Sequence, residues 1–171
     1  NLKPLAERKI SATDVMRRLR MVKDGAEIDA LRKAGAAIDR VHAQVPEFLV
    51  PGRTEADVAA DIAEAIVGEG HSEVAFIIVG SGPHGADPHH DSSPSVIADG
   101  DMVVMDFGGL MGGYGSDTTR TVHVGAAMSD EERAVHRIVE EAQQAGFEAV
   151  RVGAACQEVD RAARKVIDDA G

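Results

Sequence analysis

Apolar residues recur every three or four positions in four stretches of the chain, the spacing that predicts amphipathic helices. Three stretches begin with a capping-box pattern, a polar residue followed three positions later by an acid: Asp24 with Glu27, Thr54 with Asp57, and Ser129 with Glu132. Pro46 interrupts the first stripe after Val45. The pattern predicts helices over about residues 24–45, 54–68, 129–142 and 157–169, with a shorter helical piece at 13–20.

The middle of the chain has a different pattern, with short β-branched runs bounded by turn residues. Such runs predict strands at Val74–Val79, Met102–Phe107 and Tyr114–Val124. The last two flank a glycine-rich connection, Gly108–Gly113, so they predict an antiparallel hairpin. Because helices and strands are segregated along the chain, the expected fold class is α+β rather than an alternating parallel sheet.

Composition and charge narrow the function classes. The 171 residues carry 18 Lys and Arg against 29 Asp and Glu, a net charge of −11, which opposes binding to nucleic acid or to anionic lipid. The longest apolar run, Val74–Val79, is far too short to cross a membrane. Cys156 is the only cysteine, which fits a reducing, cytoplasmic setting.

Two aspartates stand in the predicted hairpin. Asp106 directly follows Val103–Met105, and Asp117 lies inside the next predicted strand, so the two can face each other across the hairpin. Two facing carboxylates repel unless a cation or a shared proton lies between them, and oxygen ligands suit Mn²⁺, Mg²⁺ or Zn²⁺. The simpler interpretation is a pair of strand-edge aspartates in contact with water.

A histidine-rich loop, Gly80–Asp91, separates the first strand from the hairpin. It contains His84, His89 and His90 among glycines and prolines that restrict its shape. Histidine carries protons near neutral pH and ligates metals, although a solvated polar loop is the simpler interpretation. The three histidines are too close in sequence to form a closed metal site by themselves, so further ligands would come from elsewhere.

These motifs together resemble those of the prolidase and aminopeptidase P family, Xaa-Pro peptidases within metallopeptidase family M24. The most specific resemblance is Asp106–Gly108 followed by the string Gly113–Thr121 across the hairpin. Ser81–Pro83 with Pro88–His89, Gly100–Asp101, Pro51–Glu55 and Lys23–Ile28 also match in order and spacing. The resemblance extends from about Arg20 to Gly171 and corresponds to the N-terminal half of the family's catalytic domain.

The resemblance implies a pita-bread α+β fold, with helices packed on an antiparallel sheet that holds two divalent metals. In this pattern Asp106 chelates one metal, Asp117 bridges both, and a bridging hydroxide attacks the peptide carbonyl. His89 corresponds to the histidine that contacts substrate and stabilises charge on the carbonyl oxygen. The implied metals are manganese, cobalt or zinc, with manganese favoured. The implied substrates are dipeptides or short peptides with an Xaa-Pro bond, and family habit suggests a homodimer.

The sequence departs from the family pattern in two respects. His84 stands where the family has an asparagine, which leaves the roles of His84 and His90 open. The motifs that supply the family's remaining ligands, one His and two Glu, do not occur in the 171 residues. We therefore expect residues 1–22 to be a linker and lead-in helix. Residues 23–171 are expected to be a partial catalytic domain without its C-terminal half and without the creatinase-like N-terminal domain. On that division, the parent protein is the enzyme and the 171 residues alone are inactive.

Three other assignments share this fold. Methionine aminopeptidase keeps both aspartates but fits the Gly113–Thr121 string less well, and creatinase lacks the metals that Asp106 and Asp117 would bind. A non-enzymatic pita-bread binding module is the alternative from another functional class. Both dipeptidase and aminopeptidase specificity are compatible with the motifs.

Overall fold

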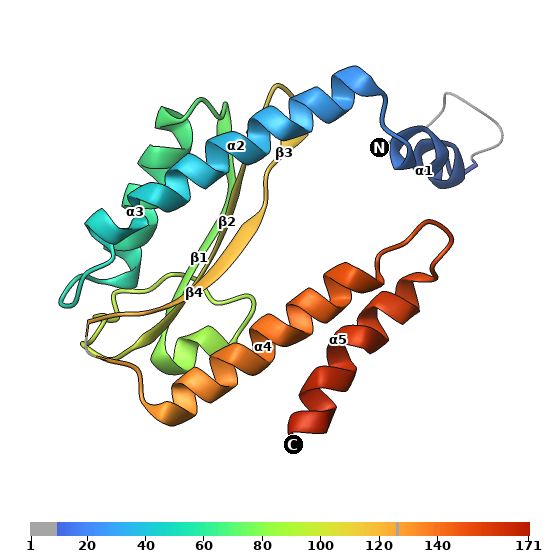
Figure 1. Cartoon of the computed structure of the whole chain (residues 1–171). Coiled ribbons are helices and arrows are strands. Elements are labelled where there is room, and N and C mark those ends of the chain that lie inside the picture. Colours follow the sequence, from blue (N-terminus) through green and yellow to red (C-terminus); the bar gives the residue numbers. More distant parts are fainter. Residues whose placement is uncertain (1–9, 126) are drawn as a thin grey trace. The chain divides into compact units, whose positions relative to one another are not determined.

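The computed structural model describes residues 10–125 and 127–171. It divides into two compact units, one ending at Val124 and the other comprising Gly125–Gly171. The first unit contains α1 (Thr13–Met21), α2 (Gly25–Phe48), α3 (Glu55–Gly68), β1 (Glu73–Ser81), the 3₁₀ helix η1 (Gly82–Ala86), β2 (Met102–Met111), β3 (Tyr114–Gly115) and β4 (Thr118–His123). The second contains α4 (Asp130–Ala149) and α5 (Cys156–Ala170). Figure 1 shows these elements.

The helices begin where their capping patterns predicted. Asp24, Thr54 and Ser129 are the N-caps of α2, α3 and α4, and each forms a complete capping box. Two predicted ends were wrong: α2 continues through Pro46 to Phe48, and α4 continues to Ala149. Proline lacks only one backbone donor, and in the last turn of α2 this loss does not end the helix.

The strands form one antiparallel sheet in which β2 is central. β1 pairs with one edge of β2, and β3 and β4 both pair with the other. Met111 pairs with Tyr114 and Met102 with His123, so β3 and β4 share a single register against β2. The predicted hairpin and the α+β class are confirmed.

The hairpin turn is shorter than the glycine pattern indicated. Only Gly112 and Gly113 form it, with φ of 59° and 85°, the left-handed pair typical of a tight two-residue turn. Gly108 and Gly109 lie inside β2 instead. A Cβ on Gly109 would come within 2.8 Å of Ile66 Cγ2 and 2.9 Å of the Glu73 carbonyl oxygen. These glycines therefore serve close packing within the sheet and against α3.

Helices α2 and α3 cover one face of the sheet, as Figure 1 shows. Along β2, Val103, Met105 and Phe107 are fully buried in the core under these helices. The alternate residues, Val104 and Asp106, are only half-buried, because successive strand side chains point to opposite faces. We call the face that carries Asp106 the open face of the sheet.

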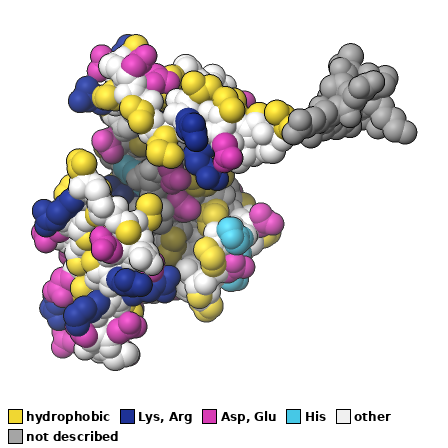
Figure 2. Space-filling model, turned by 90° about the vertical axis from the view of Figure 1, so that its right-hand side faces the viewer, with side chains coloured by type: hydrophobic (Ala, Val, Ile, Leu, Met, Phe, Trp, Pro, Cys, Tyr) yellow, Lys and Arg dark blue, Asp and Glu magenta, His cyan; other side chains and the backbone are white. Residues whose placement is uncertain are grey.

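The second unit is a helical pair. α4 and α5 approach closely at Gly146, where a Cβ would lie 3.5 Å from Ala163 Cβ. Among the helices that the structure describes, none is long and apolar enough to cross a membrane. In Figure 2 acidic and basic side chains are interspersed with hydrophobic ones over the face that is drawn.

Candidate functional site

Asp106 lies near the middle of β2 on the open face of the sheet. Its partner across the hairpin is Thr119 of β4, whose hydroxyl donates a hydrogen bond of 2.7 Å to Asp106 Oδ1. Ile78 of β1 lies opposite Asp106 on the other side. The strand holds the carboxylate half-buried, with one oxygen oriented by Thr119.

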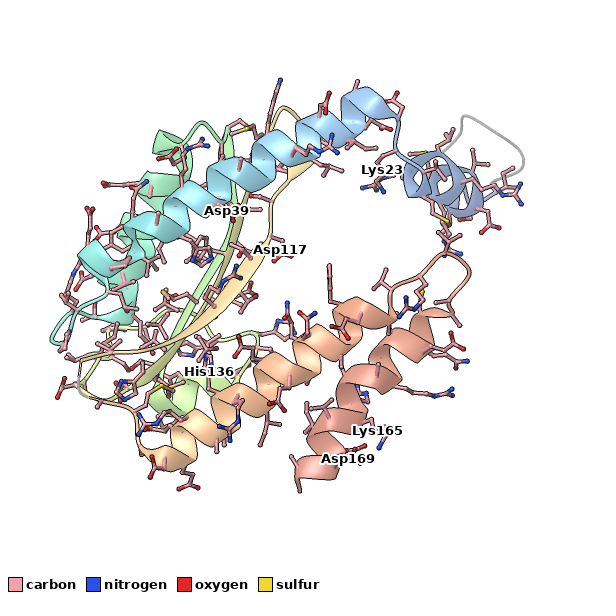
Figure 3. All side chains as sticks on the ribbon, in the orientation of Figure 1. Lys23, Asp39, Asp117, His136, Lys165 and Asp169 are labelled. Atoms are coloured by element: carbon pink, nitrogen blue, oxygen red, sulfur yellow. The ribbon has the colours of Figure 1, made fainter. Side chains whose placement is uncertain are left out.

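Asp117 lies in the segment between β3 and β4 and is exposed (labelled in Figure 3). Its neighbours Ser116 and Thr118 both point to the helical face, where they contact His71 and His42. Because side chains alternate along an extended strand, Asp117 shares the open face with Asp106. The common register places Asp117 opposite Gly108, so the two aspartates are diagonal neighbours and not the directly facing pair expected from the hairpin.

A buried histidine fixes the residue before Asp117. His71 Nδ1 donates to the Ile66 carbonyl oxygen (3.1 Å), and His71 Nε2 lies 2.9 Å from Ser116 Oγ. The same hydroxyl oxygen accepts the Gly109 N–H at 3.2 Å. His71 and Ser116 are nearly inaccessible to water, so this network anchors the point where β3 passes into β4.

The two aspartates supply part of the ligand set that a hard divalent cation needs. Two carboxylates on one face of a sheet supply the oxygen ligands that Mn²⁺ and similar ions prefer. Within residues 10–125 and 127–171, neither aspartate belongs to a group of three or more candidate ligand atoms. The two carboxylates therefore fit the metals that the resemblance implies as part of a ligand set.

The histidine loop reaches the same face of the sheet. A Cβ on Gly85 of η1 would lie 3.0 Å from Val104 Cγ2, and Val104 is the neighbour of Asp106 on the open face. His89 lies further along the loop and is exposed. Its backbone N–H donates a hydrogen bond of 2.9 Å to Asp87 Oδ1.

His84 and His90 behave differently from His89, because both bind Glu55. Glu55 is the first residue of α3 and is fully buried, and its two carboxylate oxygens lie 2.8 Å from His84 Nδ1 and 2.8 Å from His90 Nε2. The two imidazole rings stack with centroids 4.3 Å apart. Sequence reasoning named Glu55 only as part of a motif, because nothing local distinguishes it from other acids in a helix's first turn.

The carboxylate of Glu55 is ionised despite its burial. Burial raises its pKa, but hydrogen bonds from Ser93, His90, Ser81 and His84 outweigh that effect and lower the pKa from 4.5 to about 2. Glu55, His84 and His90 also offer three ligand atoms within 4.8 Å of one another, a group that could hold a metal ion.

Comparisons with known proteins place these residues in context. The model of the family described as metallopeptidase family M24 matches residues 29–171. The chain is 68% identical over 143 residues to a probable dipeptidase PepE of Mycobacterium tuberculosis, covering 83% of this chain and 38% of that protein. It is 36% identical over 139 residues to an Xaa-Pro dipeptidase of Pyrococcus furiosus, covering 81% and 40%. The chain thus spans about two fifths of the length of these curated relatives.

Solved structures of related proteins have a similar fold. The structure of dipeptidase PepE from Mycobacterium ulcerans is similar with a TM-score of 0.89 and 61% identity, over 94% of this chain and 43% of that one. Prolidase from Pyrococcus furiosus is similar with a TM-score of 0.88 and 35% identity, over 92% and 47%. This likeness confirms the expected pita-bread α+β fold.

Proposed function

The chain belongs to metallopeptidase family M24, and from that premise we propose that the protein it comes from is a metal-dependent peptidase. We propose further that it cleaves Xaa-Pro bonds of dipeptides or short peptides with the help of two divalent cations. Residues 23–171 would form part of the catalytic domain, preceded by a lead-in segment over residues 1–22. A homodimer remains a prediction.

One observation carries the proposal: Asp106 and Asp117 share the open face of the sheet, and the histidine loop reaches that face. Asp106 would bind one cation and Asp117 would contribute to both. When bound, such cations supply Lewis acidity toward a peptide carbonyl and a water nucleophile of lowered pKa. Manganese is the ion we favour, with cobalt and zinc as alternatives, since carboxylate ligands accept all three.

The chain's own residues have two tasks in this scheme. Thr119 donates to Asp106 Oδ1 and so restricts the rotation of that carboxylate about its Cβ–Cγ bond. His89 has an exposed imidazole, and we assign it to hydrogen bonding with the substrate carbonyl oxygen, where negative charge develops.

Two relatives support the proposed substrate class. The Xaa-Pro dipeptidase and the prolidase of Pyrococcus furiosus are 36% and 35% identical to this chain. The Xaa-Pro bond has no N–H, so a peptidase that cleaves it cannot use a donor at the scissile nitrogen for recognition.

The exposed free thiol of Cys156 supports the reducing, cytoplasmic setting that we expect.

The direct test is cleavage by the full-length protein loaded with Mn²⁺. Ala-Pro and Gly-Pro should be hydrolysed and Ala-Ala should not. Asp106→Asn and Asp117→Asn should each lower kcat/KM at least about 100-fold, because each removes a metal-binding charge. Asp168→Asn, at an exposed position of α5, should match the wild type. Failure of the wild type on every dipeptide, with each metal, would remove the proposed activity.

A further inference from the structure

Glu55 joins the two ends of the histidine loop, Gly80–Asp91. Its Oε1 accepts from the Ser81 N–H and from His84 Nδ1, both at 2.8 Å, where the chain enters the loop. Its Oε2 accepts from His90 Nε2 at 2.8 Å and from Ser93, whose N–H and Oγ lie at 3.0 and 2.6 Å, where the chain leaves it. One buried carboxylate thus closes the loop, with one oxygen for each end.

Glu55 itself is held in place by the backbone. Its N–H donates a hydrogen bond of 3.0 Å to the Ser95 carbonyl oxygen, and the Ala56 N–H donates one of 2.9 Å to the Ser93 carbonyl oxygen. Thr54 also forms an isolated antiparallel bridge with Val96. The start of α3 and the segment that follows the loop are therefore joined by backbone hydrogen bonds, and Glu55 lies where they meet.

The same contacts argue against a metal ion at this cluster. An ionised carboxylate only accepts hydrogen bonds, so the nitrogens that face Glu55, His84 Nδ1 and His90 Nε2, carry protons and donate. A metal would need lone pairs on both nitrogens and room among five donors that already surround the two oxygens. The carboxylate's acceptor capacity is filled without a cation.

We propose that Glu55 is a positioning residue that orients His89 toward the open face through its hydrogen bonds to His84 and His90. This inference rests on the proposed function, since His89 is the group that would contact substrate. His89 lies between Pro88 and His90, so its direct neighbour His90 is the residue that Glu55 holds. Glu55 does not touch the reacting atoms and acts only through the loop.

The first experiment measures kinetics in the full-length protein. Glu55→Gln replaces one acceptor oxygen by an NH₂ group that faces donors, so the loop should loosen and kcat/KM should fall about 10- to 100-fold. Glu64→Gln, an exposed glutamate of the same helix, is the matched control and should leave kcat/KM unchanged. The Mn²⁺ affinity of Glu55→Gln should stay within about twofold of wild type, because Asp106 and Asp117 are not altered.

A double-mutant cycle separates positioning from general damage. In a His89→Ala background, Glu55→Gln should cause little further loss, because the residue that Glu55 positions is already gone. An equal further loss in that background would overturn the proposal, since Glu55 would then act independently of His89.

The second experiment needs no activity. In ¹H–¹⁵N spectra of the full-length protein, Glu55→Gln should increase the motion of loop amides around His89, and Glu64→Gln should not. Unchanged motion of the loop amides in Glu55→Gln would overturn the proposal that Glu55 holds the loop. Added Zn²⁺ should leave the His84 and His90 ring signals in place, and their saturable shift would show a metal site instead. If the wild-type protein cleaves no peptide, the proposed function fails, and these spectra still decide whether Glu55 holds the loop.

Discussion

At the scale of single residues, the most informative side chain is Glu55. A fully buried carboxylate is costly unless its lone pairs are filled, and here main-chain and side-chain donors fill them. Its partners are 26 to 38 positions away in the sequence. The sequence predicted the helix start beside it through Thr54, because capping is local, but no local pattern could reveal contacts of that range.

The ionised state of Glu55 predicts a loss of stability in acid. Its pKa is about 2 in the folded chain against an ordinary value of 4.5, so its contribution is complete above about pH 4.5 and is lost as the pH falls toward 2. That contribution is about 3 kcal/mol. The groups that face it are His84, His90 and, through Ser81, Asp101.

Urea unfolding of the wild type and of Glu55→Gln between pH 7 and pH 2.5 tests this. The wild type should be the more stable at pH 7, and the difference between the two should shrink steadily below pH 4.5. A difference that stays constant down to pH 2.5 would contradict an ionised, hydrogen-bonded Glu55.

The hydroxyl of Ser116 predicts a second effect on stability. Ser116→Ala leaves the Gly109 N–H and His71 Nε2 buried without this partner, which should cost about 2 kcal/mol of unfolding free energy. Ser72→Ala removes a hydroxyl that bonds to the Leu110 carbonyl oxygen but is exposed to water, so its cost should stay below about 0.5 kcal/mol. Equal costs in urea unfolding would show that the buried network contributes nothing particular.

At the scale of elements, sequence patterns gave the order of helices and strands correctly. Capping boxes and β-branched runs are local signals, so α2, α3, α4 and the hairpin were predictable. The glycines of the hairpin were not: Gly108 and Gly109 were expected in the turn and lie in β2. A glycine that permits a turn and a glycine that permits close packing are identical in sequence.

This distinction between the glycines is testable by adding a methyl group. Gly109→Ala places a Cβ within 2.9 Å of Ile66 Cγ2, the Glu73 carbonyl oxygen and His71 Cδ2, so it should destabilise the chain by about 1–3 kcal/mol. Gly115→Ala, in the partner strand, meets only Leu110 Cδ2 at 3.9 Å and should be nearly neutral. Thermal unfolding of both variants measures the difference, and a neutral Gly109→Ala would show that β2 shifts to accommodate the methyl group.

At the scale of the whole molecule, the sequence predicted the candidate ligands Asp106 and Asp117 but not the separate contacts of the three loop histidines. Asp106 and Asp117 were identified because an acid within an apolar strand is unusual, and the hairpin brings them to one face. His84 and His90 were grouped with His89 by sequence proximity, and only the folded loop separates their contacts with Glu55 from the exposed ring of His89. The diagonal offset of the aspartates depended on a register that only the turn position determines.

The partial donor set leads to a last prediction, about the 171-residue chain on its own. Mn²⁺ prefers about six oxygen or nitrogen ligands, and Asp106 and Asp117 have no third protein ligand beside them among the described residues. The isolated chain should therefore bind Mn²⁺ weakly, at high micromolar or weaker affinity by calorimetry, and should show no cleavage of Ala-Pro. Asp106→Asn should abolish even this weak binding, and Asp168→Asn should preserve it. Tight binding that survives Asp106→Asn would mean that other residues bind the cation. Glu55, His84 and His90 would then be the first residues to mutate.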